Sequence, residues 1–294
     1  MRIAIMGASG FIGTELSQYL CKKGHDIIAC DIFETSNHLF KDYNNYKYAK
    51  IDNLTERILN AVECMVILAG IRPYEGFSIE DYFNNIKILD SYIKVALRNK
   101  ITNIVFASSK AVYSGHNIPW SEDEYPIPSS LYGASKLACE QLGLYYANKN
   151  NLSFKALRFA QVIGKGERKG YLINTLLDNA VAKKTQIIFG SGDQRRHYVY
   201  IKDVCRSILC AAKHKNISGV FNIGMVHTTS NLEMAECVNT IFDNKGNVVH
   251  DYTQKMSMIN DEMQISKARN ILEFSAKYDL VETFKDIKAD ETRL

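Results

Sequence analysis

The feature that most constrains the fold is the N-terminal stretch Met1-Arg-Ile-Ala-Ile-Met-Gly-Ala-Ser-Gly-Phe-Ile-Gly13. Residues 3–6 are apolar and predict a short buried strand, and residues 14–23 predict a helix. Between them, glycines follow at three-residue spacing. We expect Gly7 to allow a sharp turn, Gly10 to admit a pyrophosphate close to the backbone, and Gly13 to let helix and strand pack closely. The pyrophosphate would lie at the helix N-terminus, where backbone N–H groups and the helix dipole favour an anion.

An acidic residue at the end of the next apolar run indicates the class of cofactor. Asp31 follows the run Asp26–Cys30 and lies eighteen residues after Gly13. A carboxylate there can accept hydrogen bonds from adenosine ribose hydroxyls, and it repels a 2′-phosphate. Residues 32–34 contain no Arg or Lys that would neutralise such a phosphate. The pattern therefore favours NAD over NADP, the alternative being a solvated loop carboxylate.

Composition excludes several classes of function. The chain has 294 residues, a net charge of +4 and no long basic run, so it shows no footprint for nucleic acid. Seven cysteines without a CxxC pair are typical of reduced thiols, and we expect Cys205 and Cys210 to pack in a helix rather than to bind metal. The first strand leaves no room for a signal peptide, and no apolar run approaches the length of a membrane span. We therefore expect a cytoplasmic protein without a membrane partner or a metal.

Strand and helix alternate through the first half of the chain. Further predicted strands cover residues 48–52, 64–68 and 104–107, and predicted helices cover 54–62 and 78–98. This alternation predicts an α/β fold with a Rossmann-type, doubly wound parallel sheet, in which ligands lie beyond the carboxyl ends of the strands. Five candidate ligand residues share that position: Gly7, Asp31, Asp52, Gly70 and Ser109.

The second half of the chain departs from this alternation. Residues 114–130 predict a long irregular loop, followed by a helix over 132–149 and a strand over 154–159. The sequence becomes polar and basic after Gly164, and we place the change of domain there. Residues 1–164 would form the NAD-binding domain, and residues 165–197 and 225–294 a smaller α/β substrate domain. Segments near 198–224 are expected to return to the first domain.

A tyrosine and a lysine lie four residues apart in Tyr132-Gly-Ala-Ser-Lys136. On a helix, residues i and i+4 share a face with side chains roughly 5–6 Å apart, and an ammonium at that distance stabilises a phenolate. Such a tyrosine can take a proton from a sugar or alcohol hydroxyl, and return it, while hydride passes to a nicotinamide. Ser109 would hydrogen-bond to the same oxygen. We interpret the Tyr132–Lys136 pair as catalytic because it follows a dinucleotide-binding pattern in the same chain.

Three motifs in this order resemble the extended short-chain dehydrogenase/reductases, namely Gly7–Gly13, Ser108–Tyr113 and Tyr132–Lys136. Within these, the chain is similar to the NAD-dependent epimerase/dehydratase branch that acts on nucleotide sugars. The likeness continues through Leu157–Phe159, Arg195–Val204 and Val220–Gly224. It covers residues 1 to about 240, with a weaker match at Ile265–Arg269.

The resemblance implies roles for residues at matching positions. The implied catalytic residues are Ser109, Tyr132 and Lys136. The implied cofactor contacts are Gly7, Gly10, Phe11, Ile12, Gly13, Asp31, Ile32, Asp52, Leu68, Ala69, Gly70, Arg72, Asn85, Ala107, Tyr132 and Lys136. The implied substrate contacts are Ser109, Gln161, Tyr171, Leu172 and Arg196, with Arg196 gripping the nucleotide diphosphate. For Arg168, a solvated loop charge and a phosphate contact are both open.

Departures from the family pattern reduce the number of activities that the sequence can support. Ile67 stands where the family has His, Gln161 where it usually has Asn, and His197 where it has Asp. Lys110 and Ala111 occupy the positions where sugar 4,6-dehydratases carry an Asp-Glu pair. Elimination of water needs a general acid, and Lys-Ala does not obviously provide one, so a dehydratase is disfavoured.

These residues predict an NAD-dependent nucleotide-sugar 4-epimerase, with Tyr132 as acid/base while hydride leaves and returns at C4. A nucleotide-4-keto-sugar reductase or a sugar dehydrogenase is the alternative. A non-catalytic dinucleotide-binding protein is least expected, because it would not need Tyr132 and Lys136. The expected partner is a nucleotide-diphosphate sugar. Relatives further imply a homodimer through the helices at 78–98 and 132–149, whose tyrosines would lie in the interface or the core: Tyr82, Tyr92, Tyr145 and Tyr146.

Overall fold

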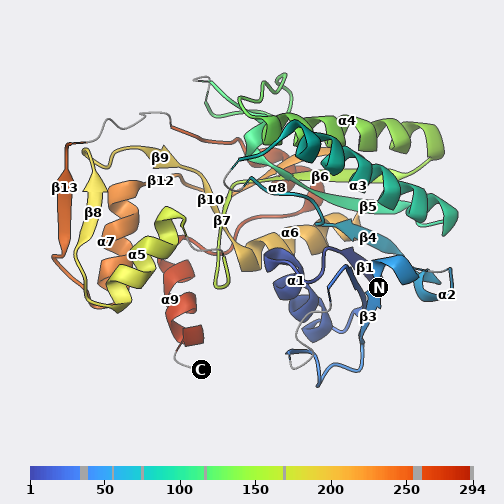
Figure 1. The fold of residues 1–294 in the computed structure, drawn as a ribbon, viewed down its shortest axis with the longest axis horizontal. Helices are drawn as coiled ribbons and strands as arrows, with labels where there is room; N and C mark the ends of the chain where they lie inside the picture. The colour runs from blue at the N-terminus through green and yellow to red at the C-terminus, as the bar shows by residue number, and fades with distance from the viewer. Residues whose placement is uncertain are drawn as a thin grey trace.

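The computed structural model describes residues 1–33, 39–54, 56–73, 76–115, 118–167, 170–253 and 260–291. In this part of the chain, the centre is a seven-stranded sheet in the order β11-β6-β5-β4-β1-β2-β3, with every pair parallel (Figure 1). Its strands are β1 (Arg2–Met6), β2 (Asp26–Asp31), β3 (Tyr46–Lys50), β4 (Cys64–Ile67), β5 (Asn103–Ser109), β6 (Ser153–Phe159) and β11 (Gly219–Ile223). The strand order reverses at β1, and a crevice at such a switch point is where doubly wound sheets bind ligands.

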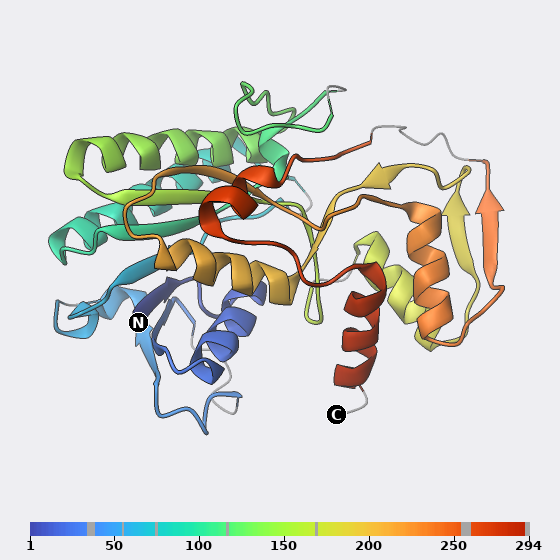
Figure 2. The same cartoon turned by 180° about the vertical axis from the view of Figure 1, so that it is seen from behind.

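Helices cover both faces of this sheet, which confirms the predicted Rossmann-type fold. One face carries α1 (Phe11–Lys22), α6 (Ile201–Lys213) and α8 (Ser266–Leu272). The other carries α2 (Glu56–Leu59), α3 (Ile79–Arg98) and α4 (Leu131–Asn150), as Figures 1 and 2 show from opposite sides. Because side chains alternate along a strand, β1 contributes Ile3 and Ile5 to the first core and Ala4 and Met6 to the second.

The two long helices begin at serine caps that fix where they start. The Ser78 hydroxyl accepts a hydrogen bond from the Asp81 N–H, and the Asp81 carboxylate accepts one from the Ser78 N–H, a capping box at α3. At α4, the Ser130 hydroxyl accepts a hydrogen bond from the Gly133 N–H (3.1 Å). Tyr132 is therefore held in the first turn of α4.

A smaller lobe lies beside the sheet, on the left of Figure 1. Its strands form pairs: β7 (Gln161–Ile163) with β10 (Tyr198–Tyr200), β8 (Gln186–Phe189) with β13 (Val248–Asp251), and β9 (Arg195–Arg196) with β12 (Thr229–Ser230). The helices α5 (Leu172–Val181), α7 (Asn231–Ile241) and α9 (Leu280–Glu291) complete it. A separate apolar core holds this lobe together, with members such as Ile173, Leu176, Met234, Val238 and Phe284.

Some predicted elements differ in the structure. The third strand lies earlier than the predicted 48–52, because Tyr46 stacks on Phe40 (ring centroids 3.9 Å apart) and pairs with Ile27. The helix predicted over 54–62 is shorter in the structure, where only α2 forms. Ala61, shortly after it, has a positive φ of 59°, which is incompatible with a continuing right-handed helix. Residues 198–200 pair with β7 outside the central sheet.

The strand at 219–223 does join the sheet, beside β6. The limits of the two domains remain a prediction. On α6, Cys205 is fully buried and Cys210 is half-buried, as expected of core packing. Across the described ranges, no helix combines the length and the apolar character that crossing a bilayer requires.

Candidate active site

The glycine loop after β1 is shaped by close backbone contacts. Gly7 has a φ of +87°, and a Cβ atom there would lie 2.7 Å from the Ala69 N atom. A Cβ on Gly13 would lie 2.3 Å from the Gly7 carbonyl oxygen, so this glycine lets α1 approach the loop. At Gly10, the nearest atom to such a Cβ would be the Gly7 oxygen at 3.4 Å. The contacts at Gly7 and Gly13 agree with the sharp turn and the close helix packing expected there.

The N-terminus of α1 suits the diphosphate of a dinucleotide. Its N-cap, Gly10, has no side chain to cap the first turn, and the leading N–H groups of a helix have no partner within it. Asp31 ends β2 beside this loop, and its carboxylate accepts hydrogen bonds from the N–H groups of Ser9 and Ile32, each 2.8 Å long. A glycine cradle with an aspartate at the next strand end fits NAD, and Phe11, Ile12 and Gly13 lie in that first turn.

The loop after β4 supplies the next predicted cofactor residues, Leu68, Ala69, Gly70 and Arg72. Asn85 of α3 is buried and holds this loop from behind: its Oδ1 accepts from the Ile71 N–H (2.7 Å), and its Nδ2 donates to the Ile71 oxygen (3.1 Å). Nδ2 also donates to Ser135 Oγ on α4 (3.1 Å). Asn85 thus ties the cofactor loop to the helix that carries Tyr132.

The outer cofactor residues lie at the rim. Arg72 and Ile32 are exposed, and Asp52 has 76% of its side chain in solvent, just past the end of β3. Arg168 lies outside the described residues.

Tyr132, Lys136 and Ser109 gather where β5 meets α4. Lys136 is buried, its Nζ donates to the Ala107 oxygen (2.9 Å), and it lies 5.8 Å from the centre of the Tyr132 ring. Ser109 is the last residue of β5, and its Oγ accepts from the Ala111 N–H (3.1 Å). A Cβ on Gly133 would lie 1.9 Å from the Ala111 oxygen, so this glycine allows α4 to touch the turn after Ser109.

A buried ion pair that the sequence interpretation missed locks this arrangement. Arg158 of β6 donates through Nη2 to Glu140 Oε2 on α4 (2.7 Å), and both side chains are almost fully buried. Ser108 Oγ also donates to Glu140 (2.5 Å), and Arg158 Nη1 donates to the Tyr113 hydroxyl (2.5 Å). Glu140 lies one helical turn after Lys136, and this spacing was the sequence feature that could have indicated a charged residue on the same face of the helix. The pair joins the helix of Tyr132 to β6, and the Ser108 hydrogen bond joins the same helix to β5, the strand of Ser109.

A cavity of about 310 Å³ opens in the smaller lobe. Four of the five predicted substrate residues line it, namely Gln161, Tyr171, Leu172 and Arg196, whereas Ser109 does not. The sequence interpretation missed its remaining wall: Gly170, Ile173, Ile187, Ile188, Phe189, Gln194, Tyr198 and Asn231. Apolar β8 residues face an arginine and several amides, so the cavity suits a flat ring next to an anion.

The neighbouring side chains of Arg195 and Arg196 make different contacts. Arg195 donates to both carboxylate oxygens of Glu233 (3.0 Å each) and to the Thr228 oxygen (2.7 Å), so it holds the lobe together. Arg196 lines the cavity instead. Asn231 begins α7 and is buried, its Nδ2 reaches Gln194 Oε1 at 3.5 Å, and within the described ranges its Oδ1 has no hydrogen-bond partner. No motif marks Asn231, because it lies 35 residues from Arg196 in the chain.

The unusual Lys110 and His197 prove to be structural. Lys110 Nζ donates to Asp261 Oδ2 (2.7 Å), and Asp261 Oδ1 accepts from the His197 N–H (2.6 Å). His197 Nδ1 accepts from the Met263 N–H (2.9 Å), so its Nε2 carries the proton toward the Met225 oxygen (2.7 Å). Burial lowers the pKa of both Lys110 and His197. The position after Ser109 thus holds an ion-paired amine, not an acid.

A parallel, doubly wound sheet with a glycine loop at the point where its strand order reverses is the fold of dinucleotide-binding proteins. The chain belongs to the NAD dependent epimerase/dehydratase family, whose sequence profile matches residues 3–224. It is therefore an NAD-dependent enzyme of the nucleotide-sugar epimerase/oxidoreductase class.

Individual relatives span almost the whole chain. A putative UDP-glucose 4-epimerase from Methanocaldococcus jannaschii is 29% identical over 97% of this chain and 96% of its own length. The solved UDP-N-acetylglucosamine 4-epimerase from Bacillus cereus is 30% identical and has a TM-score of 0.88, covering 100% of this chain and 97% of that one. MoeE5, solved with UDP-glucuronic acid and NAD, is 25% identical with a TM-score of 0.85, and both chains are covered completely.

Proposed function

We propose that the protein is an NAD-dependent 4-epimerase of UDP-linked sugars. The observation that carries the proposal is the tyrosine placed as acid/base, Tyr132 with Lys136 beside it, together with the ion pair of Lys110 and Asp261 at the position where a dehydratase has its second acid. Inversion at C4 requires one proton acceptor that later becomes the donor, and it consumes nothing else. An elimination would need a further acid.

The residues of the chain would divide the work as follows. Bound NAD would supply the acceptor for the C4 hydride and its return to the opposite face of the sugar. Tyr132 takes the proton of the C4 hydroxyl and later gives it back. Lys136, fixed on the Ala107 oxygen, stabilises the phenolate electrostatically, and Ser109 hydrogen-bonds to the sugar oxygen.

The residues that line the cavity support the proposal that it binds the nucleoside diphosphate part of the substrate. Arg196 is the cation within it, and a guanidinium meets phosphate oxygens in pairs. Phe189 and the isoleucines of β8 offer an apolar wall for a base, while Asn231 adds an amide oxygen that has no hydrogen-bond partner in the described ranges. The relatives named above act on or bind UDP-sugars, which favours UDP as the nucleotide.

A measurement of bound cofactor separates the proposal from a reductase or dehydrogenase. We expect freshly purified protein, once denatured, to release near-stoichiometric NAD, because an epimerase recycles its nicotinamide. The native protein should then interconvert UDP-glucose with UDP-galactose, or the N-acetylated pair, as followed by proton NMR. A protein that is empty of cofactor, and that oxidises reduced nicotinamide only when a 4-keto sugar is added, would contradict the proposal.

A further inference from the structure

One carboxylate lies between the two parts of the candidate site. Asp261 belongs to the segment that leads from the smaller lobe to α8 (Figures 1 and 2). Its Oδ2 accepts a hydrogen bond from Lys110 Nζ (2.7 Å), and its Oδ1 accepts one from the His197 N–H (2.6 Å). Lys110 directly follows Ser109 in the turn after β5, and His197 directly follows Arg196. A single side chain therefore contacts the neighbour of a proposed catalytic residue and the neighbour of a proposed substrate residue.

The main chain on both sides of Arg196 is bound to this same segment. The Asp261 N–H donates to the Arg195 oxygen (3.1 Å), and Asn260 Oδ1 accepts from the Arg195 N–H (2.8 Å). On the other side, Asp261 holds the His197 N–H through its side chain. Arg196 thus lies between two residues that Asp261 binds, so the position of Asp261 sets the position of β9.

The ion pair that connects this segment to the catalytic turn is partly shielded from water. The Lys110 and Asp261 side chains are 16% and 10% exposed, and a pair at that depth is screened less than one in open solvent. The segment also has main-chain bonds of its own, from the Trp120 N–H to the Glu262 oxygen (2.8 Å) and from the Gln264 N–H to the Trp120 oxygen (2.9 Å). Removal of the ion pair therefore leaves the segment held and frees only the turn that contains Lys110.

Inversion at C4 requires that two parts of the substrate are held at a fixed separation. In the proposed function, the cavity with Arg196 takes the diphosphate, while Ser109 and Tyr132 take the oxygen at C4. Arg196 belongs to the smaller lobe, and the other two residues belong to the central sheet and its helices. A displacement of about 1 Å at the reacting atoms can cost roughly 100-fold in rate. The separation of the two groups therefore has to be set by contacts between the lobes.

We propose that Asp261 is a positioning residue that, through its ion pair with Lys110, fixes the span between the diphosphate site and the acid/base. This inference rests on the proposed function, since it takes a nucleotide-diphosphate sugar as the ligand. The nucleoside diphosphate binds with or without the ion pair, because Arg196 and the cavity remain. The sugar reaches Tyr132 in the reactive position only while the ion pair is intact.

Two variants break the ion pair from opposite sides. Lys110→Met removes the amine, and Asp261→Asn removes the charge while its Oδ1 can still accept the His197 N–H. Lys202→Met is the matched control, because Lys202 of α6 is ion-paired with Asp286 of α9 and so also joins the lobes, and neither residue lines the cavity. For wild type, the three single variants and the Lys110→Met/Asp261→Asn double variant, calorimetry on the NAD-loaded protein gives the Kd of UDP. Steady-state kinetics give kcat for the UDP-sugar that the wild type epimerises.

Each single variant of the ion pair should lower kcat by about 10- to 100-fold, while the Kd of UDP stays within about threefold of wild type. The double variant should lose no more than the larger single loss, because both substitutions remove the same interaction. Lys202→Met should match wild type in both measurements.

Several outcomes would overturn the positioning role: kcat within about threefold of wild type, UDP affinity that falls together with kcat, losses that add in the double variant, or an equal loss in Lys202→Met. A loss in Lys110→Met alone would mean that the amine acts on the substrate directly, which also overturns it. A wild type that neither binds UDP nor epimerises UDP-sugars contradicts the proposed function itself.

Discussion

At the scale of the residue, the proposed catalysis depends on how firmly Lys136 and Tyr132 are held in place. Hydrogen bonding to the Ala107 oxygen and contact with the Phe106 ring (4.7 Å from its centre) fix the ammonium. The Tyr132 ring packs edge-on against Phe77 with the ring centres 5.7 Å apart. These contacts involve the ring and the amine, so the phenolic oxygen is the part of Tyr132 that remains for chemistry.

We expect Tyr132→Phe to lower kcat for 4-epimerisation by about 10²–10⁴-fold, the usual contribution of a positioned acid/base. The amount of co-purified NAD should not change, because the ring and its packing are retained. Steady-state kinetics and cofactor quantification measure the two effects. Tyr145→Phe is the matched control on the same helix, since Tyr145 is exposed. Turnover within threefold of wild type in Tyr132→Phe would remove Tyr132 from the mechanism.

At the scale of the element, a buried ion pair joins α4 to β6. Breaking a buried pair from one side leaves an uncompensated charge, so we expect Glu140→Gln to lower the free energy of unfolding by about 3–5 kcal/mol. The exposed pair of Lys215 and Glu63 is the comparison, and Lys215→Met should cost no more than about 1 kcal/mol. Chemical denaturation at neutral pH measures both. Equal costs would show that the buried pair does not hold the helix in place.

Strand β6 also buries the amine of Lys155, which has no carboxylate partner among the residues that the structure describes. Lys155 donates to Asn103 Oδ1 (2.7 Å) and the His214 oxygen (2.8 Å), and burial lowers its pKa from 10.5 to about 8. Between these two values the unfolded chain binds the extra proton, so stability rises with pH across this window.

From pH 7.5 to 9.5, the wild type should gain about 2 kcal/mol of unfolding free energy relative to Lys155→Met, which cannot titrate there. Urea denaturation of both proteins at the two pH values gives this difference, and the cysteine and tyrosine titrations common to both proteins cancel. A difference that stays constant with pH would mean that the amine keeps its ordinary pKa in the folded state.

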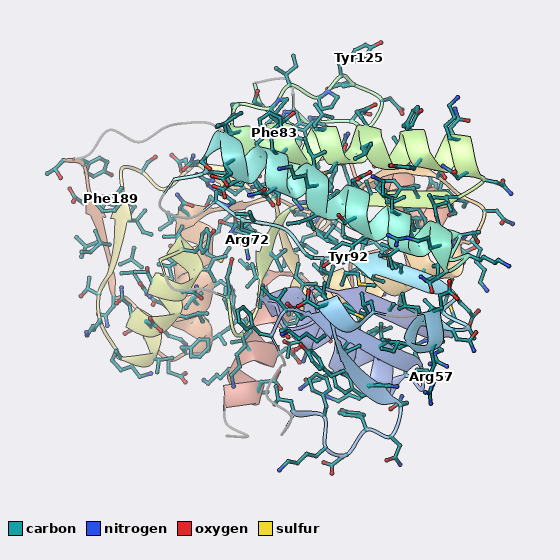
Figure 3. All side chains as sticks on the ribbon, turned by 45° about the vertical axis from the view of Figure 1, so that its right-hand side comes forward. Arg57, Arg72, Phe83, Tyr92, Tyr125 and Phe189 are labelled. Atoms are coloured by element: carbon teal, nitrogen blue, oxygen red, sulfur yellow. The ribbon has the colours of Figure 1, made fainter. Side chains whose placement is uncertain are left out.

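At the scale of the whole molecule, α3 and α4 each expose large apolar side chains. Tyr92 is buried in the core, but Phe83 and Tyr145 are 52% and 58% exposed, with Ile79 and Leu131 also exposed. Figure 3 shows Phe83 on the outside of α3. These helices are the ones through which a homodimer is predicted, and a dimer formed there would cover these exposed apolar side chains.

We expect Phe83→Glu to convert a dimer into a monomer at micromolar concentration, because the dimer would bury a charge without a partner. Sedimentation velocity distinguishes the two states. Val249→Glu is the control, since Val249 is equally exposed (54%) on β13 in the smaller lobe and should not alter the assembly. A wild type that sediments as a monomer would contradict the predicted dimer.

The sequence by itself determined the class of fold and the family of enzymes to which the chain belongs. The strand–glycine–helix start, the alternation of strands and helices, and the Tyr132–Lys136 spacing are local patterns, and local patterns follow from the periodicity of helices and strands. Errors arose where tertiary contacts overrode propensity, as when stacking of Tyr46 on Phe40 moved the third strand.

Only the tertiary structure decided how the site is closed and supported. Arg196 meets Asn231 in one cavity, and Lys110 meets Asp261, although each pair is separated by 35 or more residues in the chain. Such partners leave no periodic signal, because folding brings them together through the packing of two lobes rather than through the geometry of one helix or strand.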